Sequence, residues 1–424
     1  MSGALAQEAE TLARAAIASV DVFARTFSAL PRLPPARARV VVVAIGKAAP
    51  TMARAAIDRW GPRIARMLVI TTDGTSTAPL DGIVPPPEGL DVMFAPHPLP
   101  DARSVVAAEA ALSAVAGQAK DLALVLVSGG ASPLVCAPVS GMTLDDERAL
   151  LVDLHASGAP ITAINLVRRH LSRIRGGGLA RAALPGRTLT LVVSDVLVSS
   201  RAGHVEGARP IDVGSGPGTP DDTTIDDARA ALRRFAPRRA EQLEPLLQTA
   251  FPAAHLDAHR TRSRIVASPF ELADAARAAV EAAGYATRVV PPSLDDVDTV
   301  ARETLELARG LSAGSACVRV AEPAVVLPDP ARRGRGGRAG RLALTVWSQG
   351  LPDDVAFACL ASDGVDGSGG GAGAVVSGVA PPGAERALEA FDDAPFLAQH
   401  GALVAARPTG TNLLDVHVLL RRRA

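Results

Sequence analysis

The chain contains few lysines, few cysteines and few aromatic residues. Lys47 and Lys120 are its only lysines among 44 basic residues, and aromatic residues make up 3% of the sequence. Arginine does not replace lysine where a compact ammonium group must reach a single point, so a lysine retained in an arginine-rich chain marks a candidate functional position. The cysteines Cys136, Cys317 and Cys359 are too far apart to predict a metal site or a disulfide framework, and they favour a reducing compartment.

The sequence also lacks net charge and long apolar runs. Its 44 basic residues balance 44 acidic residues, which argues against nucleic acid or an anionic membrane surface as a partner, because both attract clustered basic charge. No run is long and apolar enough to span a bilayer, and residues 1–23 are typical of an amphipathic helix rather than a signal peptide. We therefore expect a soluble, cytoplasmic protein that binds a small molecule, and we leave open whether it forms a homo-oligomer.

The pattern that is present is that of a large α/β protein. The 424 residues, 48% of them hydrophobic, are enough for two or three domains. Fully apolar strands separated by helices are typical of parallel sheets covered on both faces. Capping patterns at Thr143 and Ser268 predict helix starts, and the polar stretch 225–265 indicates a domain boundary. The predicted strands are 39–45, 67–72, 121–127, 188–194, 286–290 and 355–361.

Three of these strands run directly into glycine-bearing loops, and we expect a helix after each. The loops are 45–48, 127–132 and 361–364. Ligands of open α/β sheets bind at the carboxyl ends of the strands, where glycines let backbone N–H groups approach an anion. Each loop suits a phosphate or a carboxylate, although each alone is also compatible with an ordinary tight turn. None contains a Walker A motif or a dinucleotide GxGxxG motif. Lys47 lies in the first loop and could place its ammonium group over a phosphoryl group.

Several charged side chains near these loops are further candidates. Asp195 and Asp363 each follow a strand, where a carboxylate can hold Mg²⁺ or cap a helix. His97 lies in a proline-rich extended segment and could contact substrate or serve as a structural hydrogen-bonder. The segment 165–178 reads as two helical turns in which one pair of arginines could reach an anionic substrate and the other water, although such a run of charges is also typical of a solvated face. These two pairs are Arg168 with Arg175, and Arg169 with Arg173.

These segments together resemble the class II glycerate kinases, or glycerate 2-kinases, whose two domains are called DUF4147 and MOFRL and which are often labelled hydroxypyruvate reductase. Ten short segments match in order over nearly the whole chain. They are AIGKAA (44–49), HPLPD (97–101), LVSGGAS (126–132), SGAPITAINLVRRHLSRIRGGGLA (157–180), SDV (194–196), SGPGTPDDTT (215–224), GGR (336–338), SDGVDG (362–367), AGAVV (372–376) and RPTGTNLLDV (407–416).

The resemblance implies ATP-dependent phosphorylation of D-glycerate to 2-phosphoglycerate with Mg²⁺. It implies a large Rossmann-like, doubly wound parallel-sheet domain (residues 1–245), a smaller α/β domain (residues 246–424) and an active site in the cleft between them. It also implies residue roles. These are Lys47, Arg338 and Asp195 as catalytic residues, with Asp195 also on the metal; Gly46, Ser128, Gly129, Gly130, Ser132 and Arg168 for the substrate or its phosphate; and Asp363, Gly364, Asp366, Thr411 and Asn412 for the nucleotide.

The chain departs from the family pattern mainly on the nucleotide and metal side. The family motif GGRNQE reads GGRAGR here, and SGGGS reads SGGAS. The missing groups are mostly acidic or amide side chains, whereas Lys47, the Ser128–Ser132 loop and Arg168 are kept. The other departures are Val320–Pro323 in place of SGGET, Gly370 in place of an aspartate, and the longer Leu197–Arg209 segment in place of PGDDP.

Three functions therefore stay open at this point. The leading hypothesis is a kinase acting on D-glycerate or a related hydroxy acid. The second is a relative that binds a small hydroxy acid without phosphorylating it, which the altered segments motivate. The third is a hydroxypyruvate reductase, which the absence of a dinucleotide fingerprint and of the acid that would bind the ribose disfavours.

Overall fold

The computed structural model describes residues 2–32, 38–83, 89–117, 121–199, 205–250, 260–327 and 334–424. Lys120 and parts of the predicted segments 197–209, 225–265 and 328–340 lie outside these residues. The chain forms two compact units that are discontinuous in sequence. The N-terminal unit comprises Val22–Val196 and Ala208–Ala267, and the C-terminal unit comprises Met1–Asp21, Leu197–Gly207 and Ser268–Ala424.

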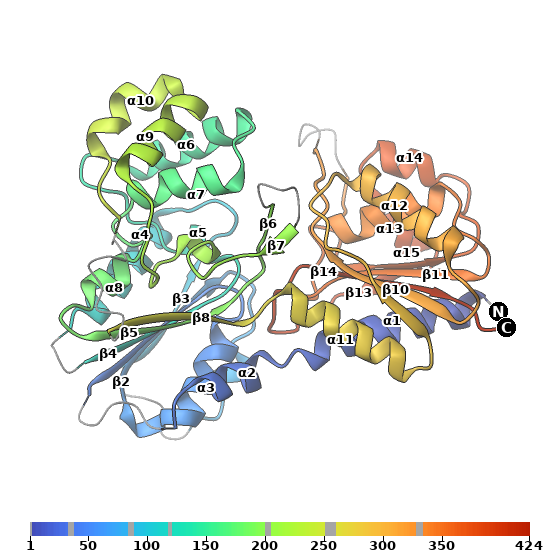
Figure 1. The fold of residues 1–424 in the computed structure, drawn as a ribbon, viewed down its shortest axis with the longest axis horizontal. Helices are drawn as coiled ribbons and strands as arrows, with labels where there is room; N and C mark the ends of the chain where they lie inside the picture. Colours follow the sequence, from blue (N-terminus) through green and yellow to red (C-terminus); the bar gives the residue numbers. More distant parts are fainter. Residues whose placement is uncertain are drawn as a thin grey trace. The chain divides into compact units, whose positions relative to one another are not determined.

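The N-terminal unit is built on a six-stranded, fully parallel sheet with the strand order β3-β2-β1-β4-β5-β8 (Figure 1). This is the order of a doubly wound Rossmann-like sheet, and it reverses between β1 and β4. The predicted parallel α/β architecture is confirmed for this unit. The strands are β1 (Val40–Ile45), β2 (Ile64–Thr72), β3 (Leu90–Ala95), β4 (Leu122–Val127), β5 (Arg187–Val193) and β8 (Thr261–Ala267).

Helices cover both faces of this sheet, which explains why β1 and β4 are apolar at every position. In Figure 1, α2 (Val22–Ala29) and α3 (Ala49–Trp60) lie on one face, and α4 (Ala102–Val115), α5 (Ala131–Leu134) and α8 (Gly178–Ala182) lie on the other. A separate apolar cluster joins a group of four helices beyond the sheet. These are α6 (Leu144–Ala156), α7 (Ile161–His170), α9 (Ile225–Phe235) and α10 (Pro237–Leu243).

The C-terminal unit contains a six-stranded mixed sheet in the order β13-β12-β11-β14-β10-β9. Only β9 and β10 pair in parallel; the other neighbours are antiparallel. The strands are β9 (Ala286–Val289), β10 (Ser315–Ala321), β11 (Val355–Ala361), β12 (Gly371–Ser377), β13 (Leu403–Ala405) and β14 (Asp415–Arg421), and a hairpin of β6 (Leu197–Ser199) and β7 (Val205–Gly207) belongs to the same unit.

Helices also lie on both faces of the mixed sheet. In Figure 1, α1 (Ser2–Ser19) and α11 (Pro269–Ala282) pack on one face, opposite α12 (Val297–Gly310) and α13 (Arg338–Ser348). The short helices α14 (Ala384–Glu389) and α15 (Asp393–Gln399) pack against α13. The helix α1, from the first residues of the chain, belongs to the C-terminal unit, so the compact units are not continuous segments of sequence. The boundary between residues 245 and 246 therefore remains a prediction.

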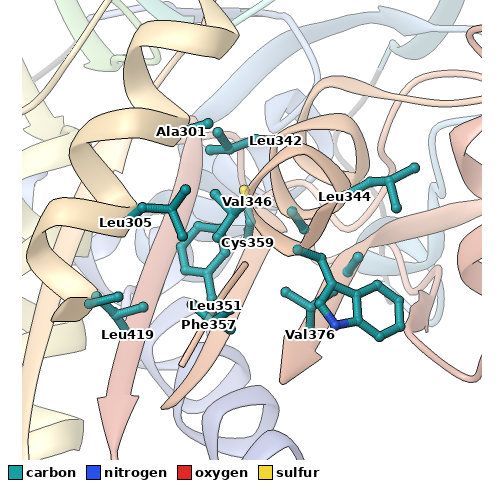
Figure 2. Packing of buried hydrophobic residues seen from close by; sticks show 14 of the residues in the cluster. Ala301, Leu305, Leu342, Leu344, Val346, Leu351, Phe357, Cys359, Val376 and Leu419 are labelled. Atoms are coloured by element: carbon teal, nitrogen blue, oxygen red, sulfur yellow. The ribbon is translucent and has the colours of Figure 1, made fainter. Parts of the chain in front are cut away.

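The core of this unit lies between the sheet and α12 and α13. Figure 2 shows Phe357 and Cys359 of β11 facing Leu342 and Val346 of α13, with Leu305 of α12 beside them. All five side chains are buried. Burying one large apolar side chain contributes roughly 1.5–3 kcal/mol, so this layer fixes the helix that carries Arg338 onto the sheet.

The expectation that residues 355–361 form part of a parallel sheet is wrong. The strand there, β11, pairs antiparallel with both β12 and β14. Its side chains are all buried because α1 and α13 cover its two faces. Continuous hydrophobicity reports burial on both faces, which parallel strands usually have, and it carries no direct information on strand direction. The loop at 361–364 leads into β12. The prediction that a helix follows this loop is therefore wrong.

The predicted helix starts are confirmed. The Thr143 side chain accepts a hydrogen bond from the Asp146 amide while Asp146 bonds back to the Thr143 amide, which closes a capping box at α6. Ser268 and Glu271 form the same motif at α11. No helix among the described residues is long and apolar enough to cross a membrane.

Candidate active site

The loops after β1 and β4 meet where the strand order of the N-terminal unit reverses. The Lys47 amide donates to the Gly129 carbonyl oxygen (3.0 Å), and the Ala48 amide donates to the Ser128 hydroxyl (3.0 Å). Gly46 has φ +122°, and a Cβ there would lie 2.3 Å from the Ser128 Oγ. Only glycine fits this close approach. The first two predicted loops are therefore interlocked and present Lys47 at the carboxyl edge of the sheet.

Lys47 and His97 both flank Gly130. A Cβ placed on Gly130 would meet the His97 Cδ2 at 3.3 Å and the Lys47 Cγ at 3.5 Å. Gly130 has φ +79° and directly precedes the first turn of α5. The segment HPLPD, which the sequence left open between a substrate contact and a structural role, thus lies beside the lysine loop. A side chain at position 130 would fill the space between the lysine and the histidine.

A buried group of charges lies behind the loop after β4. Arg168 donates from Nη1 to the Ser132 hydroxyl (3.1 Å), and Arg175 donates from Nη2 to the Ser132 carbonyl oxygen (2.9 Å). Glu147 joins the two arginines: its Oε1 lies 2.8 Å from the Arg175 Nη1 and 3.5 Å from the Arg168 Nη2. The Cys136 thiol donates to the other carboxylate oxygen of Glu147 (2.9 Å). Ser132 is therefore held by two guanidinium groups.

Burial and mutual repulsion shape the protonation of this group. Desolvation, together with the nearby Arg175, lowers the pKa of Arg168 to about 10. Burial alone would raise the pKa of Glu147, but Arg175 and Arg168 hold it below its usual value. Burial and the neighbouring carboxylate raise the pKa of Cys136 to about 12, so this thiol is neutral. At neutral pH the group holds two guanidinium cations and one carboxylate.

The hydroxyl of Ser132 belongs to a chain of hydrogen bonds with one consistent direction. Ser215 donates to the Asn165 Oδ1 (3.0 Å), so its single proton is used there. Ser132, 3.0 Å from Ser215, must then donate to it and accept from Arg168. Ser215 is nearly fully buried and has φ 58°, a left-handed conformation that a non-glycine residue rarely adopts. This backbone strain places the Ser215 hydroxyl against Ser132.

The helical prediction for segment 165–178 is wrong in its second half. The helix α7 ends at His170, and Arg173 and Arg175 lie in the loop before α8. Arg168 and Arg175 still meet, but through Glu147 rather than through helical spacing. Arg169 does not face water: it is buried and pairs with Asp221 (2.6 Å). Only Arg173 is an exposed side chain, paired with Glu109.

Sequence reasoning missed Glu147, Asn165 and Ser215. Glu147 stands in the acidic first turn of α6, where a carboxylate favours a helix start by itself. Nothing in that local pattern distinguishes it from Asp145 and Asp146. Asn165 and Ser215 lie in segments that match the family pattern, but the resemblance implies no role for either of them.

Asp195 lies just beyond β5 at the same edge of the sheet. The Ser194 hydroxyl accepts from the Val196 amide (3.2 Å), which closes a tight turn around Asp195. Because β4 and β5 are parallel neighbours, their carboxyl ends and the loops that follow lie at one edge. Mg²⁺ commonly takes one or two protein carboxylates and completes its shell with water and substrate phosphates. A single carboxylate at this position fits such a role.

Among residues the structure describes, no group of three or more His, Cys, Asp or Glu side chains is arranged to hold a metal ion. A divalent cation at Asp195 would therefore need ligands that the substrates bring. The predicted second metal candidate, Asp363, belongs to the C-terminal unit, where it accepts a hydrogen bond from the Val365 amide (3.0 Å). This contact is that of a turn residue.

In the C-terminal unit, Arg338 is held by two carboxylates. Its Nε donates to the Asp415 Oδ2 (2.9 Å), and its Nη1 donates to the Glu322 Oε1 (2.8 Å). Although burial opposes it, Asp415 and Glu322 raise the pKa of Arg338 well above its ordinary value. Glu322 and Asp415 were not predicted as site residues. The charge balance here is one cation to two anions, the reverse of the balance around Arg168.

Asp366 caps the helix that Arg338 begins. Its two carboxylate oxygens accept from the Ala339 amide (3.0 Å) and the Gly340 amide (2.7 Å), and a Cβ on Gly337 would overlap its carboxyl group. Burial and the nearby Asp415 raise the pKa of Asp366 to about 6 despite these bonds. Two orphan N–H groups of the first turn are thus already satisfied within the protein, whereas the sequence suggested Asp366 as a nucleotide contact.

The other predicted nucleotide residues lie near the ends of β11 and β14. Gly364 has φ +81°, and a Cβ there would meet the Arg407 carbonyl oxygen at 1.8 Å, so the two loops are in direct contact. Thr411 is buried, and Asn412 adjoins it in the loop before β14. Arg341, which replaces a family glutamate, turns inward to Asp393 (3.3 Å) and stacks over the Phe391 ring. The altered GGRAGR motif thus anchors α13 to α15.

The described residues also line an open hollow of about 820 Å³ along β9, β10 and α12. Arg288, Asp295, Glu303, Glu306 and Arg319 contribute charges of both signs to it. None of the predicted site residues lies there. We assign it no role.

The comparison with family models decides the relationship. Residues 8–249 match the model described as "Domain of unknown function (DUF4147)", and residues 311–415 match the MOFRL family. The chain belongs to the DUF4147/MOFRL glycerate kinase family. The resemblance seen in the sequence is thereby confirmed.

Two curated relatives illustrate the similarity of this glycerate kinase family member to known proteins. A protein of Agrobacterium vitis that carries the provisional name hydroxypyruvate reductase is 35% identical, over 96% of this chain and 92% of its own length. A D-glycerate 2-kinase of Thermotoga maritima is 30% identical, over 89% of each chain. A solved glycerate kinase structure from T. maritima superposes with a TM-score of 0.80 at 28% identity and covers 99% of this chain and all of the other. The expected fold is therefore confirmed at the level of the whole chain.

Proposed function

We propose that the protein transfers the γ-phosphoryl group of ATP to the 2-hydroxyl of D-glycerate or of a closely related small hydroxy acid. The observation that carries the proposal is the interlocked pair of loops at the strand-order reversal, with Lys47 on one loop and the Arg168-bound Ser132 on the other. An ammonium group, glycine amides and a buried guanidinium group together suit a small acid that becomes phosphorylated.

Each group then has a role in positioning or charge stabilisation. Arg168 and the Ser128–Gly130 loop would bind the carboxylate, and Ser132, whose hydroxyl accepts from Arg168, would position that guanidinium group. Lys47 would neutralise the phosphoryl oxygens as negative charge develops on them. Asp195 would accept the proton of the 2-hydroxyl or hold the cation. In the balanced reaction, the substrate oxygen forms a bond to the γ-phosphorus, the bond from that phosphorus to the bridging oxygen breaks, and ADP leaves.

The cofactors ATP and Mg²⁺ belong to this proposal. When bound, Mg²⁺ would offset phosphate charge, and Asp195 is the carboxylate that we propose to hold it. We further propose Arg338, with the loops at Gly364 and Thr411, as contacts for the nucleotide in the C-terminal unit.

The experiment is an ADP-release assay of the full chain with Mg·ATP and a panel of small 2-hydroxy acids. We expect turnover with D-glycerate, on the order of 1–100 s⁻¹ as in other kinases. A folded protein that releases no ADP with any member of the panel would contradict the kinase proposal.

One observation favours a second candidate, a protein that binds a hydroxy acid without phosphorylating it. Arg338 is already held by Glu322 and Asp415, and Asp366 occupies the first N–H groups of α13. Calorimetry separates the two candidates, because this alternative predicts binding of D-glycerate without binding of Mg·ATP. The hydroxypyruvate reductase activity in the name of the A. vitis relative is less favoured, since the loop after β1 lacks a dinucleotide fingerprint. Loss of nicotinamide absorbance with hydroxypyruvate would support it.

A further inference from the structure

The buried group around Glu147 carries more positive than negative charge. The side chains of Arg168, Arg175 and Glu147 are 8%, 1% and 3% exposed, and the cluster contains two cations and one anion. Arg169, the next cation along the chain, is compensated separately by Asp221. An ion removed from water is costly unless a counter-charge or hydrogen bonds compensate it. One positive charge of this cluster is therefore left for a ligand.

The position of Glu147 determines which of the two arginines is neutralised within the protein. Its Oε1 is closer to Arg175 (2.8 Å) than to Arg168 (3.5 Å). Arg175 also donates to the Ser132 and Val135 carbonyl oxygens, so its hydrogen-bond donors and its charge are directed to groups of the protein. Among the described residues, Arg168 donates from its Nη1 to Ser132, and its Nη2 makes only a longer contact with Glu147 (3.5 Å), while its buried Nε has no partner. Arg168 is thus the cation that remains for an acid.

We propose that Glu147 is a specificity-determining residue of the hydroxy-acid site: by neutralising Arg175, it leaves a single positive charge and so selects acids with one carboxylate over acids with two. This inference rests on the proposed function of the same site. Lys47 is assigned to the phosphoryl group, so a second carboxylate would find no further cation within the cluster of Arg168, Arg175 and Glu147 and would meet the negative charge of Glu147. Like charges brought together in a poorly solvated site strongly disfavour a wrong ligand.

The test is direct binding by calorimetry, without nucleotide, of D-glycerate and of tartronate, its analogue with a second carboxylate. We expect the unaltered protein to prefer D-glycerate. Glu147→Gln keeps the shape but leaves two positive charges, and we expect it to move the ratio of the two dissociation constants toward tartronate by about 10-fold. If Glu147 had a merely structural role, its substitution would weaken the binding of both ligands alike and leave this ratio unchanged.

Asp145→Asn is the matched control. It removes the same charge from the same helix turn, but Asp145 is 88% exposed and pairs only with Arg148 among the contacts shown. We expect the ratio to stay within about twofold of that of the unaltered protein, because solvent screens this charge. An equal shift in both variants would mean a general charge effect and would overturn the proposal.

Two further variants keep the test decisive if Glu147→Gln does not fold. The double change Glu147→Gln with Arg175→Gln restores one net positive charge, so the preference for D-glycerate should return. Arg175→Gln alone leaves no net charge and should move the ratio further toward D-glycerate. An unchanged ratio in Arg175→Gln overturns the proposal for Glu147, whereas failure of the unaltered protein to bind D-glycerate counts against the proposed function itself.

Discussion

The two arginine sites of this protein have opposite charge balances. Around Arg168, two guanidinium groups share one carboxylate, and both arginines are almost fully buried. Around Arg338, one guanidinium group is shared by Glu322 and Asp415, and Asp366 adds a further buried acid. The first site has positive charge left for an anion, whereas the second is already neutralised.

This difference agrees with the pattern of departures in the sequence. The segments that form the first site keep the family motifs except at Ala131, while GGRAGR and its surroundings depart from them at several positions. In the altered region, Arg341 has become an anchor for α15, and the helix N-terminus is closed by Asp366. The number of carboxylates around an arginine thus decides how much of its charge is left for a ligand and how much is used in internal packing.

The largest effect should come from Lys47, which lies on the loop that interlocks with the loop after β4. Lys47→Ala should lower the kcat for ADP release by about 10²–10³-fold, because a charge that stabilises the transferring phosphoryl group is lost. Lys47→Arg is the control: it keeps the charge on a planar group and should recover only part of the rate. Full activity of Lys47→Ala would contradict the assignment of this lysine to the active site.

Replacing Arg168 should change the KM for the acid more than the KM for the nucleotide. Arg168→Ala should raise the KM for D-glycerate about 30- to 100-fold, since a buried charge that meets the carboxylate is lost, with little change in the KM for ATP. Arg173→Ala is the comparison within the same segment, because Arg173 is exposed and pairs with Glu109. Its effect should stay within about twofold. Equal changes in both variants would contradict the assignment.

At the second site, around Arg338, removing a charged side chain should strengthen ligand binding rather than weaken it. Glu322→Gln removes one of the two acids around Arg338, so Mg·ATP should bind about fivefold more tightly as repulsion of the phosphates falls. Glu303→Gln is a matched control, because it removes a half-exposed acid that pairs with a different arginine, Arg319, in the same unit. Calorimetry with Mg·ATP measures both. Weaker binding by Glu322→Gln would show that Glu322 supports the nucleotide instead.

The smallest effect concerns Asp366 and the stability of the C-terminal unit. Its pKa in the folded protein is raised to about 6 from 3.8. Between these values the folded state holds the proton more tightly, so its contribution to stability is present below about pH 4 and is lost as the pH rises through about 6. The stability of the unaltered protein relative to Asp366→Asn should therefore fall by about 1–3 kcal/mol from pH 4 to pH 7. Denaturant unfolding at the two pH values measures it, and a constant difference would contradict the shift.

Much of the N-terminal unit could be predicted from local patterns. The apolar runs at β1, β4 and β5 predicted buried parallel strands, and the glycines after β1 and β4 marked the loops that carry Lys47 and Ser128. These features are local, because a buried strand and a close backbone approach each restrict the residue types at their own positions. The capping boxes at Thr143 and Ser268 were predictable for the same reason.

The sequence by itself determined which segments are buried, where helices begin and where the backbone must come close to another loop. Only the tertiary structure decided that β11 is antiparallel, that α1 packs on the sheet of the C-terminal unit, and that Glu147 joins Arg168 to Arg175. Hydrophobicity shows that both faces of a strand are buried but not whether its neighbours are parallel or antiparallel. The sequence also does not distinguish an acidic residue that caps a helix from one that neutralises an arginine. The partners of a buried charge are set by long-range packing, which brings together residues that no local pattern connects.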